Sequence, residues 1–160
     1  MLDTNIYGII LEKEELKAVR ELLNRPDIAI YGSRVIRSEL RATPKGRVDG
    51  INLRMDLLRL YEEITKNREI SMGKREVGVA NSYNSVYGKL GGKTSKRKMN
   101  NDFLIVSSAS LHNLDIVVSE DNATMLNALA LRTYSIVNSV LKLKTPRFIG
   151  YEKFKNEFKK

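Results

Sequence analysis

Four acidic residues stand where a parallel sheet would gather them at one edge. The chain begins MLDTNI, so Asp3 directly follows two apolar residues, and Asp121 follows the apolar stretch LDIVVS by two residues. Glu39 and Asp102 fall in segments with helical patterning that would flank the same edge. Because open parallel sheets bind ligands at the carboxyl ends of their strands, we expect the four carboxylates to converge.

Four converging carboxylates repel one another, so their ionised forms need a compensating charge. A divalent cation supplies that charge. The chain has no Cys and a single His, and oxygen ligands of this kind favour Mg²⁺ or Mn²⁺ over Zn²⁺. Such an ion lowers the pKa of a bound water and offsets negative charge on a phosphodiester, which is the chemistry that hydrolysis of a nucleic-acid backbone requires.

Each acid also has a simpler explanation. Asp102 can complement a helix dipole, and Asp121, in the sequence SEDN, can be a turn residue that bonds its own backbone. Glu39, which lies among arginines, can be a solvated charge on a helix face. Asp3 is harder to explain without a function, because its alternative is exposure at a frayed first strand.

Alternating helices and strands would position these acids. Helical spacing or capping predicts helices over residues 12–24, 33–42, 51–67, 75–90, 102–113, 125–144 and 152–160, and β-branched or extended stretches predict strands over 27–32, 114–119 and part of 144–151. Ser33 is the expected N-cap of the second helix, and Asn100 or Asn101 that of the fifth. This alternation predicts a single domain over residues 1–160 with an α/β fold, in which a parallel central sheet lies between two helical layers.

Composition narrows the class of protein. With 160 residues, of which 42% are hydrophobic, the chain can bury a substantial core. The lack of Cys favours a reducing, cytoplasmic setting, and no apolar run approaches the ~20 residues that span a membrane. The formal net charge of +9 favours a polyanionic partner such as RNA, although a high pI alone can belong to any soluble protein.

A basic run precedes Asp102. Lys93, Lys96, Arg97 and Lys98 lie in the sequence KTSKRK, which we expect to form a flexible loop beside the acids. Such a loop can hold a phosphate backbone, but it can equally be a solvated loop with no ligand.

The ordered set of motifs resembles the PIN-domain family, and within it the VapC-like metal-dependent ribonucleases. The motifs are LDTNI at the start, SEL at 38–40, NDFLIVSSASLHNLDIVVSEDN at 101–122 and TPRFIGYEKF at 145–154. The resemblance implies that Asp3, Glu39, Asp102 and Asp121 hold one or two Mg²⁺ or Mn²⁺ ions and that a metal-activated water attacks RNA. It also implies supporting hydrogen bonds from Asn5 and Ser119. Only two residues precede Asp3, fewer than such proteins usually have, so we expect a short first strand and weakened affinity for metal.

The resemblance leaves the biological role open. Many such proteins are toxins of toxin–antitoxin pairs that form homodimers and bind an acidic antitoxin, and others process RNA. A nucleic-acid-binding module that has lost cleavage is a second hypothesis, which the presence of all four acids disfavours. A structure-specific DNA nuclease is a third, although 160 residues leave little room for elements that grip DNA.

Overall fold

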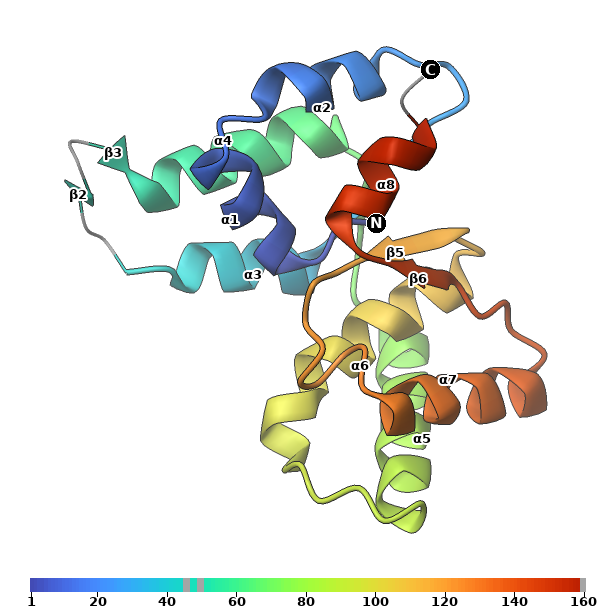
Figure 1. Cartoon of the computed structure of the whole chain (residues 1–160). Helices are drawn as coiled ribbons and strands as arrows, with labels where there is room; N and C mark the ends of the chain where they lie inside the picture. Colours follow the sequence, from blue (N-terminus) through green and yellow to red (C-terminus); the bar gives the residue numbers. More distant parts are fainter. Residues whose placement is uncertain (45–46, 49–50, 159–160) are drawn as a thin grey trace.

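The computed structural model describes residues 1–44, 47–48 and 51–158. It is mostly helical, with short strands between the helices (Figure 1). In chain order the elements are α1 (Thr4–Glu12), α2 (Leu16–Leu23), β1 (Gly32–Ser33), α3 (Arg34–Ala42), β2 (Arg47–Val48), β3 (Ile51–Asn52), α4 (Leu53–Thr65), β4 (Glu69–Ile70), α5 (Lys74–Lys89), α6 (Lys96–Leu111), β5 (Ile116–Val118), α7 (Ala128–Leu141), β6 (Arg147–Ile149) and α8 (Tyr151–Phe158).

The strands that border the site run parallel. β5 pairs with β6, so that Val117 lies opposite Phe148, and Leu2 joins the other side of β5 through an isolated parallel bridge to Val118. β1 pairs in parallel with β4, and β2 with β3 forms an antiparallel pair. The predicted parallel α/β character is therefore present. Within the described residues, however, the strands form separate pairs, and a continuous central sheet between two helical layers is not seen.

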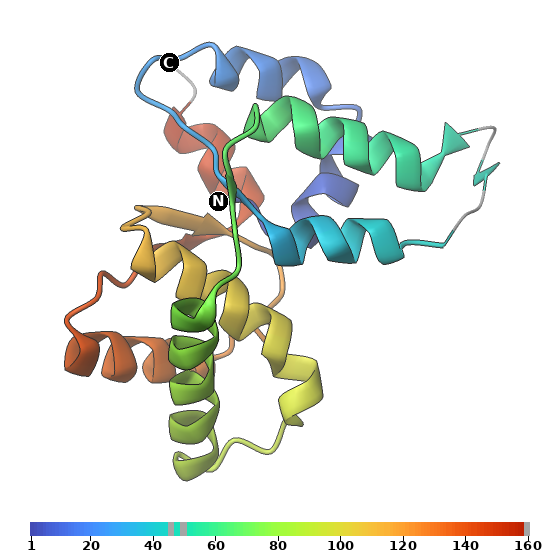
Figure 2. The ribbon, with the colours of Figure 1, turned by 180° about the vertical axis from the view of Figure 1, so that it is seen from behind.

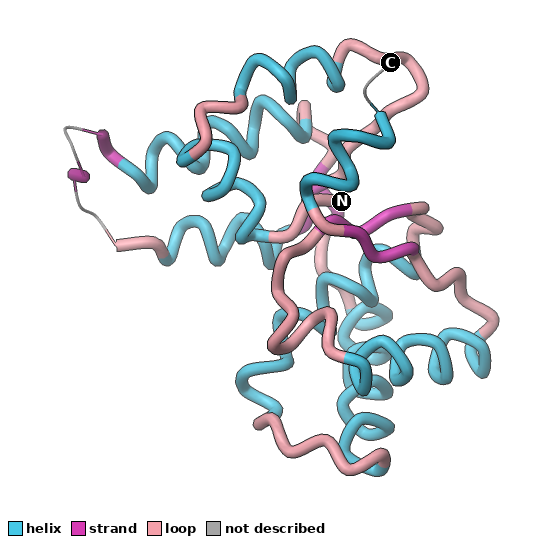
Figure 3. The backbone as a smooth tube through the Cα atoms, viewed as in Figure 1, coloured by secondary structure: helices cyan, strands magenta, loops and turns pink. Residues whose placement is uncertain are grey.

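Two groups of helices lie on either side of β5 and β6 (Figure 1). In Figures 1 and 2, α1 to α4 and α8 form one group, α5 to α7 form the other, and β5 with β6 lies between them. The tube in Figure 3 shows how little of the chain is strand, and the segments that contain β4 and β6 join the two groups. Residues from distant parts of the chain therefore meet beside β5.

Aromatic side chains fill much of the core. The rings of Tyr7 and Tyr61 have centroids 5.5 Å apart in the first group, and the Tyr61 hydroxyl lies 2.8 Å from Glu69 Oε2 and 3.1 Å from the Ser33 carbonyl, both of which can accept its proton. The second group is centred on Tyr83, Phe103, Tyr134 and Phe148. Large buried rings of this kind contribute much of the apolar area that stabilises a domain of this size.

Several predicted elements need correction. The helix predicted over 12–24 is present as α2, but it begins later than predicted: α1 ends at Glu12, Glu14 adopts a positive φ of 53°, and α2 begins at Leu16. The apolar stretch after Asp3 is helical because Asp3 caps it and its Ile6 and Ile10 side chains pack into the core. Of the predicted strand 27–32, only Gly32 pairs with a neighbouring strand.

Of two helix N-caps predicted from the sequence, one is confirmed and one is wrong. Ser33 caps α3 as predicted, because its hydroxyl accepts a hydrogen bond from the Ile36 N–H at 3.3 Å. The predicted Asn100 or Asn101 cap is wrong, since α6 already begins at Lys96 after Ser95. The basic segment therefore continues the helix instead of preceding it, which changes the surroundings of Asp102.

Candidate functional site

Asp3 lies between Leu2, which bridges to Val118 beside β5, and the start of α1, and the residue is only 5% exposed. Its Oδ1 accepts a hydrogen bond from the Thr4 N–H at 2.7 Å, and its Oδ2 accepts from Ser119 Oγ at 2.7 Å and from Asn5 Nδ2 at 2.9 Å. Burial raises the pKa of Asp3, while the hydrogen bonds from Ser119 and Thr4 oppose that rise. The buried carboxylate of Asp3 is thus held in place by three donors.

Asn5 and Ser119 link the start of the chain to the loop after β5. Ser119 Oγ donates to Asp3 and also accepts a hydrogen bond from the Asp121 N–H at 3.0 Å. The Asn5 amide lies 3.4 Å from Ser119 Oγ and accepts from the Glu120 N–H at 3.4 Å. The two residues predicted to give supporting hydrogen bonds therefore contact Asp3 and the backbone beside Asp121.

Asp121 organises its own loop. Its Oδ1 accepts hydrogen bonds from the Ala123 and Thr124 N–H groups, both at 2.9 Å, and its Oδ2 accepts from the Thr124 hydroxyl at 2.6 Å. The turn explanation therefore describes real contacts. The same carboxylate also raises the pKa of Asp3 and of Asp102, so it belongs to the acidic cluster as well.

Asp102 is the most perturbed of the four acids. It lies beyond the first turn of α6, where a helix dipole has little effect, so the dipole explanation loses its basis. Its Oδ2 is buried and has no hydrogen-bond partner among the described residues. Burial, followed by the charges of the other three acids, raises the pKa of Asp102 to about 7, although the Thr124 hydroxyl opposes the rise.

Glu39 reaches the cluster from α3. Its Oε1 accepts a hydrogen bond from Asn101 Nδ2 at 2.6 Å, and its Oε2 accepts from the Thr4 hydroxyl. A freely solvated charge would not make both contacts, so this simpler explanation does not describe Glu39. These bonds connect α1, α3 and α6 around one point.

The carboxylate oxygens of the cluster are ligands that a hard cation prefers, although several of them accept hydrogen bonds from nearby residues. Within the described residues, no group of three or more His, Cys, Asp or Glu side chains is arranged to hold a metal ion as it stands. Hydrogen bonds occupy oxygens of Asp3, Glu39 and Asp121, whereas Asp102 keeps a buried free oxygen. Oxygen donors with uncompensated negative charge are the set that Mg²⁺ or Mn²⁺ would stabilise.

A protein family model matches most of the chain. The family model described as PIN domain matches residues 1–129. The chain belongs to the PIN domain family. PIN domains are generally nucleases, and they typically use divalent metals. Comparisons with curated proteins and with solved structures gave no match.

The basic residues of this PIN domain are placed differently from the prediction. Lys96, Arg97 and Lys98 form the first turn of α6, and only Lys93 lies in the preceding loop. All four side chains are exposed. Lys98 stands four residues before Asp102 and so lies on the same face of the helix. The predicted flexible loop is therefore largely a fixed helical turn that leads toward the acids.

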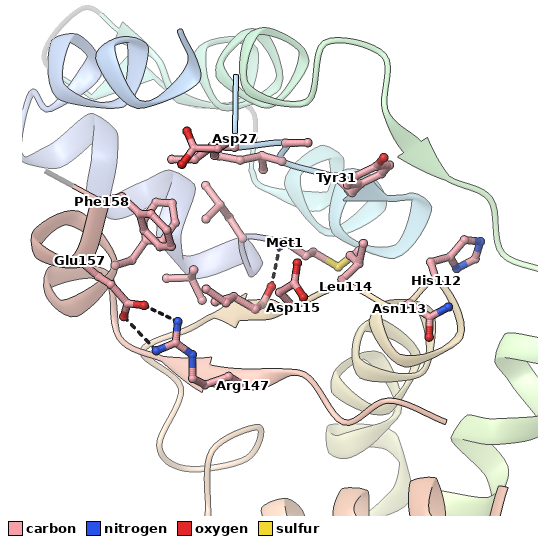
Figure 4. Close-up of a pocket in the computed structure, with 17 residues that line it drawn as sticks. Met1, Asp27, Tyr31, His112, Asn113, Leu114, Asp115, Arg147, Glu157 and Phe158 are labelled. Atoms are coloured by element: carbon pink, nitrogen blue, oxygen red, sulfur yellow. Dashed lines mark hydrogen bonds and ion pairs between the residues drawn. The ribbon is translucent and has the colours of Figure 1, made fainter. Parts of the chain in front are cut away.

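A cavity lies apart from the four acids. A cavity of about 580 Å³ opens beside the amino-terminal side of β5, between the extended segment 27–31, residues 112–116 and the end of α8 (Figure 4). Arg147 and Glu157 pair at its wall, with one contact at 3.0 Å. None of the described residues that line it is one of the four acids. Charge, not concavity, identifies the candidate site.

Some contributors were missed from the sequence. Thr4, Asn101 and Thr124 hold Glu39 and Asp121 through side-chain hydrogen bonds. Two of them stand next to a predicted acid, which was the available signal. In the part of the chain that the structure describes, no helix is long and apolar enough to cross a membrane.

Proposed function

We propose that this PIN domain is a metal-dependent endoribonuclease that hydrolyses RNA phosphodiester bonds with Mg²⁺ or Mn²⁺. The observation that carries the proposal is Asp102, whose Oδ2 is buried without a partner among the described residues, and whose pKa is raised to about 7, first by burial and then by the charges of the other three acids. A structural acid would pair with a cation or donor, whereas this arrangement leaves negative charge uncompensated.

The residues divide into ligands and positioning groups. Asp3, Glu39, Asp102 and Asp121 would hold the ion. A bound Mg²⁺ or Mn²⁺ would supply an activated water and stabilise charge on the phosphate. Asn5 and Ser119 orient Asp3, while Thr4 and Asn101 orient Glu39.

Charge outside the cluster supports RNA as the substrate. The basic first turn of α6, with Lys96, Arg97 and Lys98, would bind phosphates that flank the scissile bond, and Lys93 extends this surface. The net charge of +9 would also speed the encounter with a polyanion.

For the role in the cell, the family resemblance suggests two alternatives, a toxin and an RNA-processing enzyme. As a toxin, the protein would bind an acidic antitoxin and a second copy of itself; as a processing enzyme, it would act on structured RNA. Exposed apolar residues on α7, among them Ile136, Val140 and Leu141, support a protein partner.

The test is cleavage of an end-labelled mixed RNA with Mn²⁺ or Mg²⁺, compared with EDTA. Asp121→Asn should abolish cleavage, while Asp56→Asn on α4, in a salt bridge with Arg59, serves as the matched control. RNA binding without cleavage in the wild type would favour the binding module. Cleavage restricted to structured DNA would favour the DNA nuclease.

A further inference from the structure

Tyr134 is a buried residue on α7 with no evident structural task for its hydroxyl. The residue is 0% exposed, and its hydroxyl has no hydrogen-bond partner in the described part of the chain. It lies beyond residues 1–129, so the match to the family does not include it. An unpaired buried hydroxyl costs about 1–3 kcal/mol, a cost that phenylalanine would avoid.

Its ring is fixed by three aromatic neighbours. Tyr134 stacks on Phe148 with centroids 5.4 Å apart, and it meets Tyr83 at 5.1 Å and Phe103 at 6.0 Å edge to face. Phe103 directly follows Asp102 on α6. The hydroxyl therefore cannot turn toward solvent without disrupting this cluster.

The hydroxyl lies within electrostatic reach of the acidic site. After burial, the carboxylate of Asp102 is the largest cause that raises the pKa of Tyr134, and the carboxylates of Asp3 and Asp121 add to it. Asp102 Oδ2 is also buried without a hydrogen-bond partner among the described residues. The structure thus leaves a buried donor on Tyr134 and a buried acceptor on Asp102 without partners, and the Tyr134 ring packs against Phe103, the residue that follows Asp102.

We propose that Tyr134 is a positioning residue for Asp102, whose Oδ2 receives a hydrogen bond from the Tyr134 hydroxyl through one buried water. Such a water satisfies both atoms, as buried waters commonly do. It also stabilises the ionised carboxylate and fixes its orientation toward the cation. This inference rests on the proposed metal-dependent function, because its consequence is tighter metal binding.

The test compares Tyr134→Phe with Tyr83→Phe. Tyr83 belongs to the same aromatic cluster, but its hydroxyl donates to Asn138 at 2.6 Å and approaches Ser110 at 3.3 Å, away from the acids. Calorimetric titration with Mn²⁺ should show a dissociation constant about 10- to 100-fold weaker for Tyr134→Phe, the usual effect of losing an outer-shell partner. Tyr83→Phe should keep wild-type affinity and lower the midpoint of urea unfolding.

Wild-type Mn²⁺ affinity in Tyr134→Phe would overturn the inference while leaving the nuclease proposal intact. If the wild type binds no Mn²⁺, the proposed function fails instead. A high-resolution crystal structure without metal then decides the inference independently. Water density within hydrogen-bond distance of both Tyr134 Oη and Asp102 Oδ2 would support it, and no water between them would refute it.

Discussion

Replacing Asp102 by Asn should stabilise this protein at neutral and alkaline pH while abolishing its proposed activity. Asp102 is a half-buried acid whose pKa in the folded protein is raised from 3.8 to about 7, first by burial and then by the neighbouring carboxylates. The folded state therefore holds this proton more tightly than the unfolded state does. Asn has nearly the same shape and carries no charge at any pH.

The sign and size follow from proton linkage. Below about pH 4, Asp102 is protonated in both states, so wild type and Asp102→Asn should have similar free energies of unfolding. As the pH rises from about 4 to about 7, the unfolded chain ionises first and the wild type loses stability. At about 1.4 kcal/mol for each tenfold change in proton affinity, the upper limit is about 4 kcal/mol. Because the group is not fully buried and the site can relax, we expect about 2 kcal/mol at pH 8.

Urea unfolding in EDTA, followed by circular dichroism between pH 4 and pH 8, measures this difference. The control is Glu21→Gln, which changes an exposed residue of α2. Adding Mn²⁺ at pH 8 should then stabilise the wild type but not Asp102→Asn, because the ion offsets the same uncompensated charge.

Two results would refute this reasoning. A gain in Asp102→Asn that is equal at pH 4 and pH 8 would mean that packing, not charge, is responsible. A loss of stability at pH 8 would mean that ionised Asp102 has a compensating partner.

Further substitutions test the framework around the site. Gly32→Ala should lower the free energy of unfolding by about 1–3 kcal/mol, because a Cβ would lie 2.2 Å from Tyr61 Oη. Gly8→Ala in α1, where an added Cβ would meet no described atom within 4 Å, should instead raise the free energy of unfolding by about 0.5–1 kcal/mol. Equal changes in the free energy of unfolding for the two variants would contradict the packing argument. Ser119→Ala should cost about 1–3 kcal/mol, and more at pH 8 than at pH 5, since its hydrogen bond favours ionised Asp3; a pH-independent cost would count against that role. Replacing the three basic residues of the first turn of α6 by alanine should make the affinity for single-stranded RNA less dependent on salt. In a plot of log affinity against log salt concentration, the slope should fall in magnitude by about 0.7 for each lost phosphate contact. An unchanged slope would mean that the RNA binds elsewhere.

Local chemistry made several features predictable. Ser33 caps α3 because a short hydroxyl side chain at a helix start bonds the backbone directly. The helix predicted over 75–90 appears as α5, and the strand within 114–119 as β5, since each has a long or strongly patterned segment. The start of α6 was predicted too late, because the basic segment was taken as a loop although Lys and Arg have high helix propensity.

The sequence by itself determined which residue types are available for a site, and the tertiary structure decided which of them come together. Residue types alone indicated hard oxygen ligands, no thiolates and a basic surface. Only folding revealed that Ser119 reaches Asp3 across 116 residues and that Asn101 reaches Glu39 across 62. It also placed Asp102 beyond the first turn of α6, with Tyr134 in electrostatic reach. These contacts join residues far apart in the chain, and spacing along a sequence encodes periodicity within one element, not the packing of one element against another.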